Sequence, residues 1–122
     1  MSFDAVVEMA IQAKGLTASR VTPDDIEAEI ASEHYFTAGA AADYAPGAVN
    51  TVTVPGELPT SLHLLTFCVL VLRNGFTVTG ESACASPENF DAEIGRKIAR
   101  QKAVQKIWPL LGFRLRDKLA AK

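Results

Sequence analysis

The chain has 122 residues, of which 48% are hydrophobic and 21% charged, and its formal net charge is −2. These values are typical of an ordinary globular protein, and the length indicates one small domain over residues 1–122. The longest apolar run, residues 64–72, is much shorter than the ~20 residues that cross a bilayer, and the first residues do not resemble a signal peptide. We therefore expect no membrane partner, and we expect Cys68 and Cys84 to be free thiols in the cytoplasm.

The charges are divided unevenly along the chain. Residues 1–93 carry thirteen acidic and three basic side chains, a net charge of −10, whereas residues 94–122 carry nine basic and one acidic, a net charge of +8. A basic tail can attract anions, but the same division lets two halves of one chain, or two chains, attract each other. We expect this second effect to dominate. Nucleic-acid binding is not expected, because the acidic remainder would repel the phosphate backbone.

Two helices are predicted in the N-terminal third. Residues 3–14 carry apolar side chains at helical spacing and are followed by Gly15, which favours a helix end. A second helix is predicted to begin at Thr22, a capping residue, with Pro23 in its first turn. We expect this helix to reach Phe36.

Residues 38–61 differ from the rest of the chain because they are rich in Ala, Gly, Pro, Thr and Val. This composition predicts a long, flexible loop. However, residues 50–54 alternate with a period of two and could form an extra strand. Both interpretations stay open.

The strongest pattern is a β-hairpin centred on Asn74-Gly75, which separates two runs rich in β-branched and aromatic residues. The dipeptide predicts a two-residue turn with positive φ at both residues. The pairs would then be Arg73 with Phe76, Leu72 with Thr77, Val71 with Val78 and Leu70 with Thr79. This register predicts one face that is apolar on both strands, carrying Phe67, Val69, Val71, Phe76 and Val78.

The second face of the hairpin is apolar on the first strand but polar on the second. The polar residues form a strip of Thr77, Thr79 and Glu81. Two strands alone are marginal in water, so we expect helices or a neighbouring chain to complete the sheet. For this reason we expect a homo-oligomer.

A long helix is predicted to open at Ser86-Pro87-Glu88, with Pro109 bending or ending it. Its apolar stripe, suited to lie on a sheet, consists of Phe90, Ile94, Ile98, Val104, Ile107, Trp108 and Leu111. A short basic helix is expected from Phe113 onward. Together these elements predict an α+β domain, in which an antiparallel hairpin, possibly of three strands, packs against N-terminal helices and a long C-terminal helix.

The sequence contains no phosphate-binding loop, dinucleotide fingerprint or nucleophile elbow. Its two histidines, His34 and His63, have no spacing to a cysteine or to acidic residues that predicts a catalytic pair or a metal site. We therefore expect a protein that is not an enzyme and that uses no metal or cofactor.

The long helix offers a candidate anion site. Arg96 and Arg100 lie one turn apart on the same face, with Lys97 adjacent, and guanidinium groups can hold phosphate with two hydrogen bonds. The alternative is that these residues pair with acids of the N-terminal half. The candidate ligand-binding residues are Arg96, Lys97 and Arg100, together with the strip of Thr77, Thr79 and Glu81.

Three stretches carry a resemblance to a known family. They are Ser32-Glu33-His34-Tyr35-Phe36-Thr37-Ala38, residues 65–84, and residues 86–96 continuing through Trp108-Pro109-Leu110. They resemble a family of small tailed-phage and prophage proteins, named for gene product forty-nine of a coliphage and gene sixty-six of a Shigella phage. The likeness spans roughly residues 21–37 and 64–118. It implies action in the host bacterial cytoplasm and carries no assigned catalytic residue.

Two functions are compatible with these observations. One is a non-enzymatic, oligomeric binder of a small anionic ligand, for example a protein that sequesters a nucleotide signal of host antiviral defence. The alternative is a protein-interaction module that inhibits a host protein, which the half-apolar hairpin face favours. Weak nucleic-acid binding ranks third.

Overall fold

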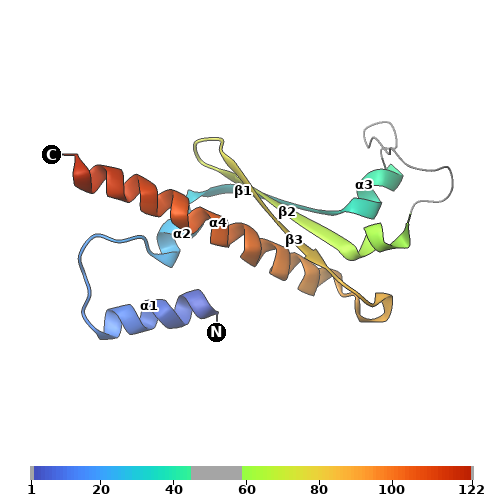
Figure 1. The fold of residues 1–122 in the computed structure, drawn as a ribbon, viewed down its shortest axis with the longest axis horizontal. Coiled ribbons are helices and arrows are strands. Elements are labelled where there is room, and N and C mark those ends of the chain that lie inside the picture. The colour runs from blue at the N-terminus through green and yellow to red at the C-terminus, as the bar shows by residue number, and fades with distance from the viewer. Residues whose placement is uncertain (1, 45–58, 122) are drawn as a thin grey trace.

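The computed structural model of the chain describes residues 2–44 and 59–121. In chain order its elements are α1 (Phe3–Ala13), α2 (Pro23–Glu29), β1 (Ile30–Thr37), α3 (Ala38–Tyr44), a 3-10 turn (Thr60–Leu64), β2 (Leu65–Leu72), β3 (Thr77–Ala83), a 3-10 turn (Pro87–Asn89) and α4 (Ala92–Ala120). The strands form one antiparallel sheet in the order β1-β2-β3, and α4 packs along it (Figure 1). The predicted α+β architecture, with a third strand and a long C-terminal helix, is confirmed. No helix within these residues combines the length and apolarity that a membrane crossing requires.

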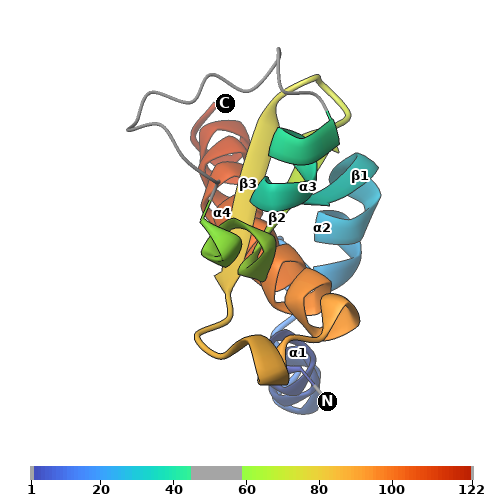
Figure 2. The same cartoon turned by 90° about the vertical axis from the view of Figure 1, so that its right-hand side faces the viewer.

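The two ends of the molecule carry different elements. Helix α3 and the Thr60–Leu64 turn lie at one end of the sheet, whereas α1 and the C-terminal half of α4 lie toward the other (Figure 1 and Figure 2). Cys68 is buried in β2 and Cys84 follows β3, and both are free thiols, as predicted.

Both N-terminal helices begin where the local signals predict, and α1 also ends where they predict. Thr22 Oγ1 accepts a hydrogen bond from the Asp25 N–H (3.1 Å), and the Asp25 carboxylate accepts one from the Thr22 N–H (2.9 Å). This reciprocal capping box starts α2, with Pro23 in its first turn. Helix α1 ends before Gly15, whose φ of +66° allows the chain to leave the helix.

The core lies between α4 and one face of the sheet. Alternate residues of β2 and β3 are buried on this face, and α2 and α4 supply the rest. The buried cluster consists of Ile26, Cys68, Leu70, Leu72, Val78, Ala99, Ala103, Val104, Ile107 and Leu111.

Helix α4 approaches β3 closely because β3 has no side chain at Gly80. A Cβ at this position would lie 2.1 Å from the Ala99 carbonyl oxygen and 2.5 Å from the Ala103 nitrogen. The helix presents small residues here as well, since Gly95, Ala99 and Ala103 are all buried. The backbones of the helix and the strand therefore meet almost directly.

The hairpin turn has three residues, so the predicted two-residue turn is wrong. The Leu72 N–H donates to the Phe76 carbonyl (2.8 Å), and the Gly75 N–H donates to the Leu72 carbonyl (2.9 Å). Arg73, Asn74 and Gly75 thus form the loop, and Gly75 has a φ of +88° whereas Asn74 does not have a positive φ. This is the three-residue arrangement in which a left-handed glycine follows a tight turn.

The three-residue turn shifts the register between β2 and β3 by one residue. As a result, the residues on each face of β2 lie beside different residues of β3 than predicted. Leu70 pairs with Val78 and Val71 with Thr77, so the predicted pairing of Val71 with Val78 is wrong. The face toward α4 is apolar on both strands, but it is built on Leu70 and not on Val71. The opposite face, which we call the open face, carries Phe67, Val69 and Val71 beside the exposed Thr77, Thr79 and Glu81.

The third strand comes from residues 30–37, where the sequence predicted that the second helix continues. Ile30 is extended (φ −82°, ψ 116°) and ends α2, and β1 then pairs with β2 over its whole length. The Arg73 N–H donates to the Glu29 carbonyl (3.0 Å), so the end of α2 is joined to the hairpin turn. In the stretch predicted as a loop or extra strand, residues 38–44 are helical, and the candidate strand at 50–54 lies outside the described residues.

Helix α4 begins later than predicted. Its cap is Asp91, whose carboxylate accepts a hydrogen bond from the Ile94 N–H (3.0 Å), whereas the predicted start at Ser86 belongs to a separate 3-10 turn. The predicted stripe is also wrong near this end, because Ile94 is 56% and Ile98 43% exposed. The close approach at Gly80 leaves room only for small side chains beneath the helix.

Helix α4 also continues through Pro109, which corrects the predicted break. Proline removes one helical hydrogen bond and crowds the preceding turn. Ile107 and Leu111 flank the proline and are both buried in the core. Beyond them, Arg114 pairs with Glu29 of α2 (2.7 Å). These contacts hold both sides of the proline in one helix.

We expect Gly80→Ala to lower the free energy of unfolding by about 3 kcal/mol, the upper part of the range for overpacked cores, because the new methyl meets backbone atoms that cannot move away alone. Gly112→Ala is the matched control, since nothing lies within 4 Å of a Cβ there, and it should stabilise the helix by roughly 0.5 kcal/mol. Urea denaturation measures both. Equal stabilities of the two variants would show that the close approach does not constrain the fold.

Candidate functional site

Arg100 lies at the centre of an ion-pair cluster and is not a free anion receptor. Its Nε donates to Glu33 Oε1 (2.9 Å), and its Nη2 donates to Glu27 Oε1 (2.7 Å). The guanidinium thus joins α4 to β1 and α2. The hydrogen bonds that Arg100 donates to Glu33 and to Glu27 raise the pKa of Arg100, and the bond to Glu33 in turn lowers the pKa of Glu33. This is the intramolecular pairing that the division of charge predicted.

The other predicted site residues do not gather around Arg100. Lys97 pairs with Glu93 on the same helix (3.3 Å), and both side chains are about three-quarters exposed (74% and 70%). Arg96 is also exposed. The strip of Thr77, Thr79 and Glu81 lies on the open face, on the other side of the sheet from α4. The structure therefore separates the six predicted residues into two groups.

A different set of cations converges between α2, the β2–β3 turn and the C-terminal half of α4. They line a cavity of about 420 Å³, which we call the basic cleft. Its charged lining consists of Arg20, Arg73, Arg114 and Lys118, with Asp25 and Glu29. Aliphatic side chains of α4 and of the segment before α2 complete its walls.

Glu29 controls the electrostatics of the basic cleft. Its side chain is 14% exposed and accepts a hydrogen bond from Arg114 Nη2 (2.7 Å). This hydrogen bond lowers the pKa of Glu29, and the charges of Arg114, Arg73 and Lys118 lower it further. Four cations and two carboxylates line the cleft, so positive charge remains in surplus.

Two cations of the basic cleft are the most available to a ligand. Arg73 Nε donates to the Ala28 carbonyl at the end of α2, which fixes the direction of its guanidinium. Neither Arg73 nor Lys118 has a carboxylate within ion-pair distance in the described part of the chain. Arg20, by contrast, is held by Glu8 through two hydrogen bonds (2.5 and 2.7 Å).

The basic cleft was not found from the sequence because its cations come from three separate parts of the chain. Arg114 and Lys118 lie one turn apart on α4, but Arg20 and Arg73 are distant from them in sequence, and only the fold brings the four together. The one signal in the sequence was the basic composition of the last 29 residues, which contain Arg114 and Lys118.

The fold and the basic cleft define a small α+β domain with a cationic cleft of ligand size. Among the residues that line the cleft there is no serine, threonine, cysteine or histidine. The chain belongs to the phage protein (N4 Gp49/phage Sf6 gene 66) family, whose model matches residues 21–119. The resemblance seen in the sequence is therefore confirmed. No curated protein and no solved structure matches the chain. Helix α1 lies outside the matched segment.

Acid should weaken the ion pairs of Glu8, Glu29 and Glu33, of which the first lies within the N-terminal segment and the other two join it to α4. Arg20 and Gln12 lower the pKa of Glu8 from 4.5 to about 2, and the pKa values of Glu29 and Glu33 are also lowered. Each carboxylate therefore stabilises the folded state fully above pH 4.5 and loses this contribution as the pH falls through its lowered pKa. We expect the free energy of unfolding to decrease between about pH 4.5 and pH 2.

Urea denaturation across this range measures the effect. Glu33→Gln should be less stable than the parent at pH 7, by about 1 kcal/mol at most because the side chain is partly exposed, and its stability should fall less steeply in acid. A parent protein whose stability is unchanged from pH 5 to pH 2.5 would contradict the assignment.

Proposed function

We propose that this phage protein binds a small anionic ligand inside the infected bacterium without converting it chemically, and that nucleotide signals of host antiviral defence are ligands of this class. The observation that supports the proposal is the basic cleft. Its volume of about 420 Å³ falls within the range of small-molecule pockets, about 300–1,000 Å³.

The residues of the basic cleft suit a phosphorylated ligand. Arg73 offers a planar fork for two phosphate oxygens, and Lys118 adds a mobile point charge. The aliphatic walls, including Leu111 and Leu115, can cover an apolar or planar group. Glu29 can accept hydrogen bonds from a ribose or a base, as a carboxylate does in many nucleotide sites.

Binding without catalysis agrees with the chemistry of the lining. A carboxylate whose pKa is lowered, such as Glu29, is a weak general base near neutral pH. The remaining charged groups are guanidinium, ammonium and the capping carboxylate of Asp25. None of these is an activated nucleophile.

We place the ligand in the basic cleft and not at the predicted trio of Arg96, Lys97 and Arg100. At the trio, an anion would have to displace two carboxylates from Arg100. Arg96 and Lys97 remain exposed and can add a weak long-range attraction for anions.

Isothermal titration calorimetry with a panel of cyclic di- and trinucleotides tests the proposal. We expect heat with at least one of them, and we expect Arg73→Ala and Lys118→Ala each to weaken binding about tenfold, because each removes a charge-assisted contact. Arg116→Ala is the matched control: it removes an exposed cation of the same helix outside the cleft, and affinity should change by less than about twofold. No heat with any nucleotide, or equal losses in all three variants, would refute the proposal.

A second candidate function is supported by the open face. Phe36 is 43% exposed and stacks on Phe67 with ring centroids 5.4 Å apart. Val69 and Val71 continue this apolar surface along β2. Contiguous exposed aromatic and aliphatic side chains favour a protein interface. A host protein is the partner we consider, and self-association through this face stays a prediction.

Affinity purification from infected cells distinguishes the second function from the first. The parent should recover one stoichiometric host protein, and Phe36→Ser should lose it because the exposed ring is replaced by a small polar group. Phe113→Ser, which changes a 72% exposed ring on α4, should retain the partner. Recovery of the phage protein alone would count against a host partner, and light scattering of the same samples reports whether copies of the chain associate.

A further inference from the structure

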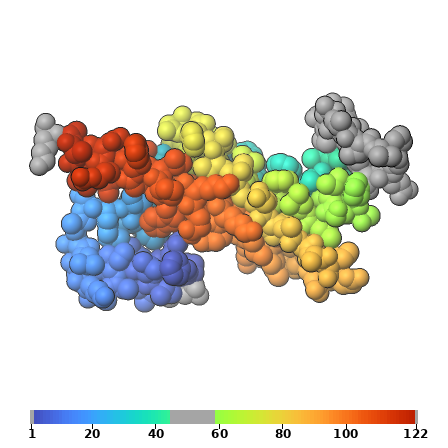
Figure 3. All heavy atoms as spheres, viewed as in Figure 1, coloured from blue at the N-terminus to red at the C-terminus, as the bar shows by residue number. Residues whose placement is uncertain are grey.

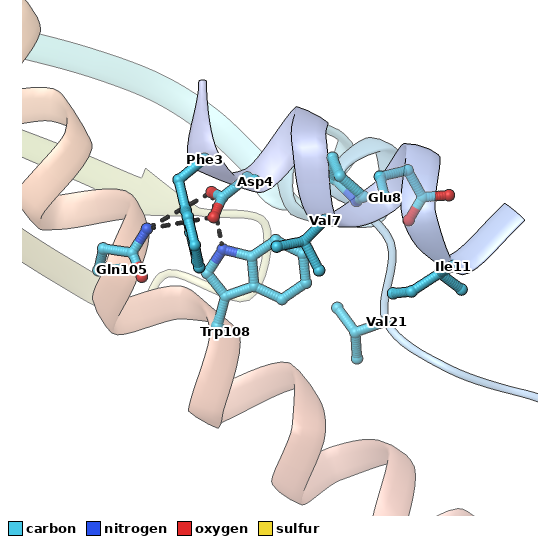
Figure 4. Close-up of a pocket in the computed structure, with 9 residues that line it drawn as sticks. Phe3, Asp4, Val7, Glu8, Ile11, Val21, Gln105 and Trp108 are labelled. Atoms are coloured by element: carbon cyan, nitrogen blue, oxygen red, sulfur yellow. Dashed lines mark hydrogen bonds between the residues drawn. The ribbon is translucent and has the colours of Figure 1, made fainter. Parts of the chain in front are cut away.

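Helix α1 covers an apolar cavity at the C-terminal half of α4, separate from the basic cleft. The cavity has a volume of about 180 Å³, and we call it the Trp108 cavity. Its apolar walls are Phe3, Val7, Ile11, Val21 and Trp108 (Figure 4). Figure 3 shows the N-terminal segment lying beside the C-terminal part of α4, at the end of the molecule remote from α3.

We infer that the Trp108 cavity binds a small organic cation, namely a protonated amine attached to an aromatic or short aliphatic body. Two features carry this inference: a carboxylate that makes no ion pair within the described residues, and two aromatic rings near it. Neither feature is part of the basic cleft, so the inference is independent of the proposed anionic ligand.

The carboxylate is Asp4, which lies at the rim of the cavity. Its Oδ2 accepts a hydrogen bond from Trp108 Nε1 (3.2 Å), and both of its oxygens lie 3.4 Å from Gln105 Nε2. Both donors are neutral, so within the described residues the negative charge of Asp4 has no cationic partner. Glu8, the other acid of the lining, is already neutralised by Arg20. A cation entering the cavity would therefore meet one carboxylate that makes no ion pair in the described part of the chain.

The aromatic rings are those of Phe3 and Trp108, whose side chains converge with Asp4 at the same end of the cavity (Figure 4). An ammonium group is attracted to the face of an aromatic ring, most strongly to tryptophan. A carboxylate beside aromatic rings thus forms a cage that selects a positive charge. The rest of the cavity is aliphatic and suits the apolar body of the ligand.

The size of the cavity and the weak attachment of α1 allow entry. An apolar cavity of about 150 Å³ is large enough for benzene. No residue of α1 is buried, and Phe3 is 76% exposed. Helix α1 also precedes the family match, which begins at residue 21. It can therefore adjust around a ligand without disturbing the core beneath α4.

Trp108 is the single tryptophan of the chain, so its intrinsic fluorescence reports directly on the cavity. The probes are phenethylammonium and its neutral analogue 2-phenylethanol, titrated into the full-length protein at pH 7. Phenethylammonium should change the fluorescence saturably and bind about tenfold more tightly than the alcohol. Asp4→Asn should abolish this preference, whereas Asp117→Asn, which removes an exposed acid elsewhere on α4, should preserve it.

Circular dichroism establishes that each variant is folded. If Asp4→Asn does not fold, Phe3→Leu provides the second test, because it keeps apolar bulk but removes one ring: binding of the amine should weaken about threefold and binding of the alcohol should not. Equal affinities for amine and alcohol in the parent, or an unchanged preference in the variant used, would overturn the inference. So would the absence of a saturable signal.

Discussion

The close contact between α4 and β3 at Gly80 is the constraint on which the rest of the structure depends. Because the helix backbone lies directly on the strand, its position is set by Ala99 and Ala103 against the glycine. Once this crossing is fixed, the helix can pass the edge of β1 and the end of α2. Arg100 then reaches the carboxylates of α2 and β1, and the C-terminal half of α4 extends past the hairpin turn. A side chain at this one position would clash with the backbone of α4 at Ala99 and Ala103.

The uneven division of charge follows from the same crossing. The acidic elements α2 and β1 lie along the basic helix, so Glu27 and Glu33 meet Arg100, and Glu29 meets Arg114. Arg100 and Arg114, the two cations of α4 that reach the N-terminal elements, each have a carboxylate partner. Beyond the sheet the basic residues outnumber the acids, and the surplus forms the basic cleft. The composition of the sequence predicted that the acidic and basic halves attract each other. It did not predict where basic residues would remain without acidic partners.

Local signals in the sequence correctly predicted the helix ends that depend on local interactions. The predicted helix cap at Thr22 and the predicted helix end at Gly15 are confirmed because they depend on neighbouring residues alone. Asn74-Gly75 is compatible with both a two-residue and a three-residue turn, and the choice between them sets which residues of β2 face the helix. The packing of the core, and not the dipeptide itself, determines which turn forms. Strand β1 was missed for a related reason: its inward side carries Glu33, which is stabilised there by Arg100, so the usual apolar alternation is absent.

The candidate sites illustrate the same limit. The spacing of Arg96 and Arg100 is visible in the sequence, but spacing does not reveal whether carboxylates approach from another element. Arg73 was predicted to pair with Phe76 across the turn, yet in the three-residue turn its side chain binds the end of α2 and lines the same cleft as Arg114. The register of one turn thus decides both which side chains enter the core and which cation reaches the basic cleft. The hairpin thus contributes both to the core and to the proposed ligand site. Its contribution to that site is Arg73 in the turn, and not the polar strip of Thr77, Thr79 and Glu81.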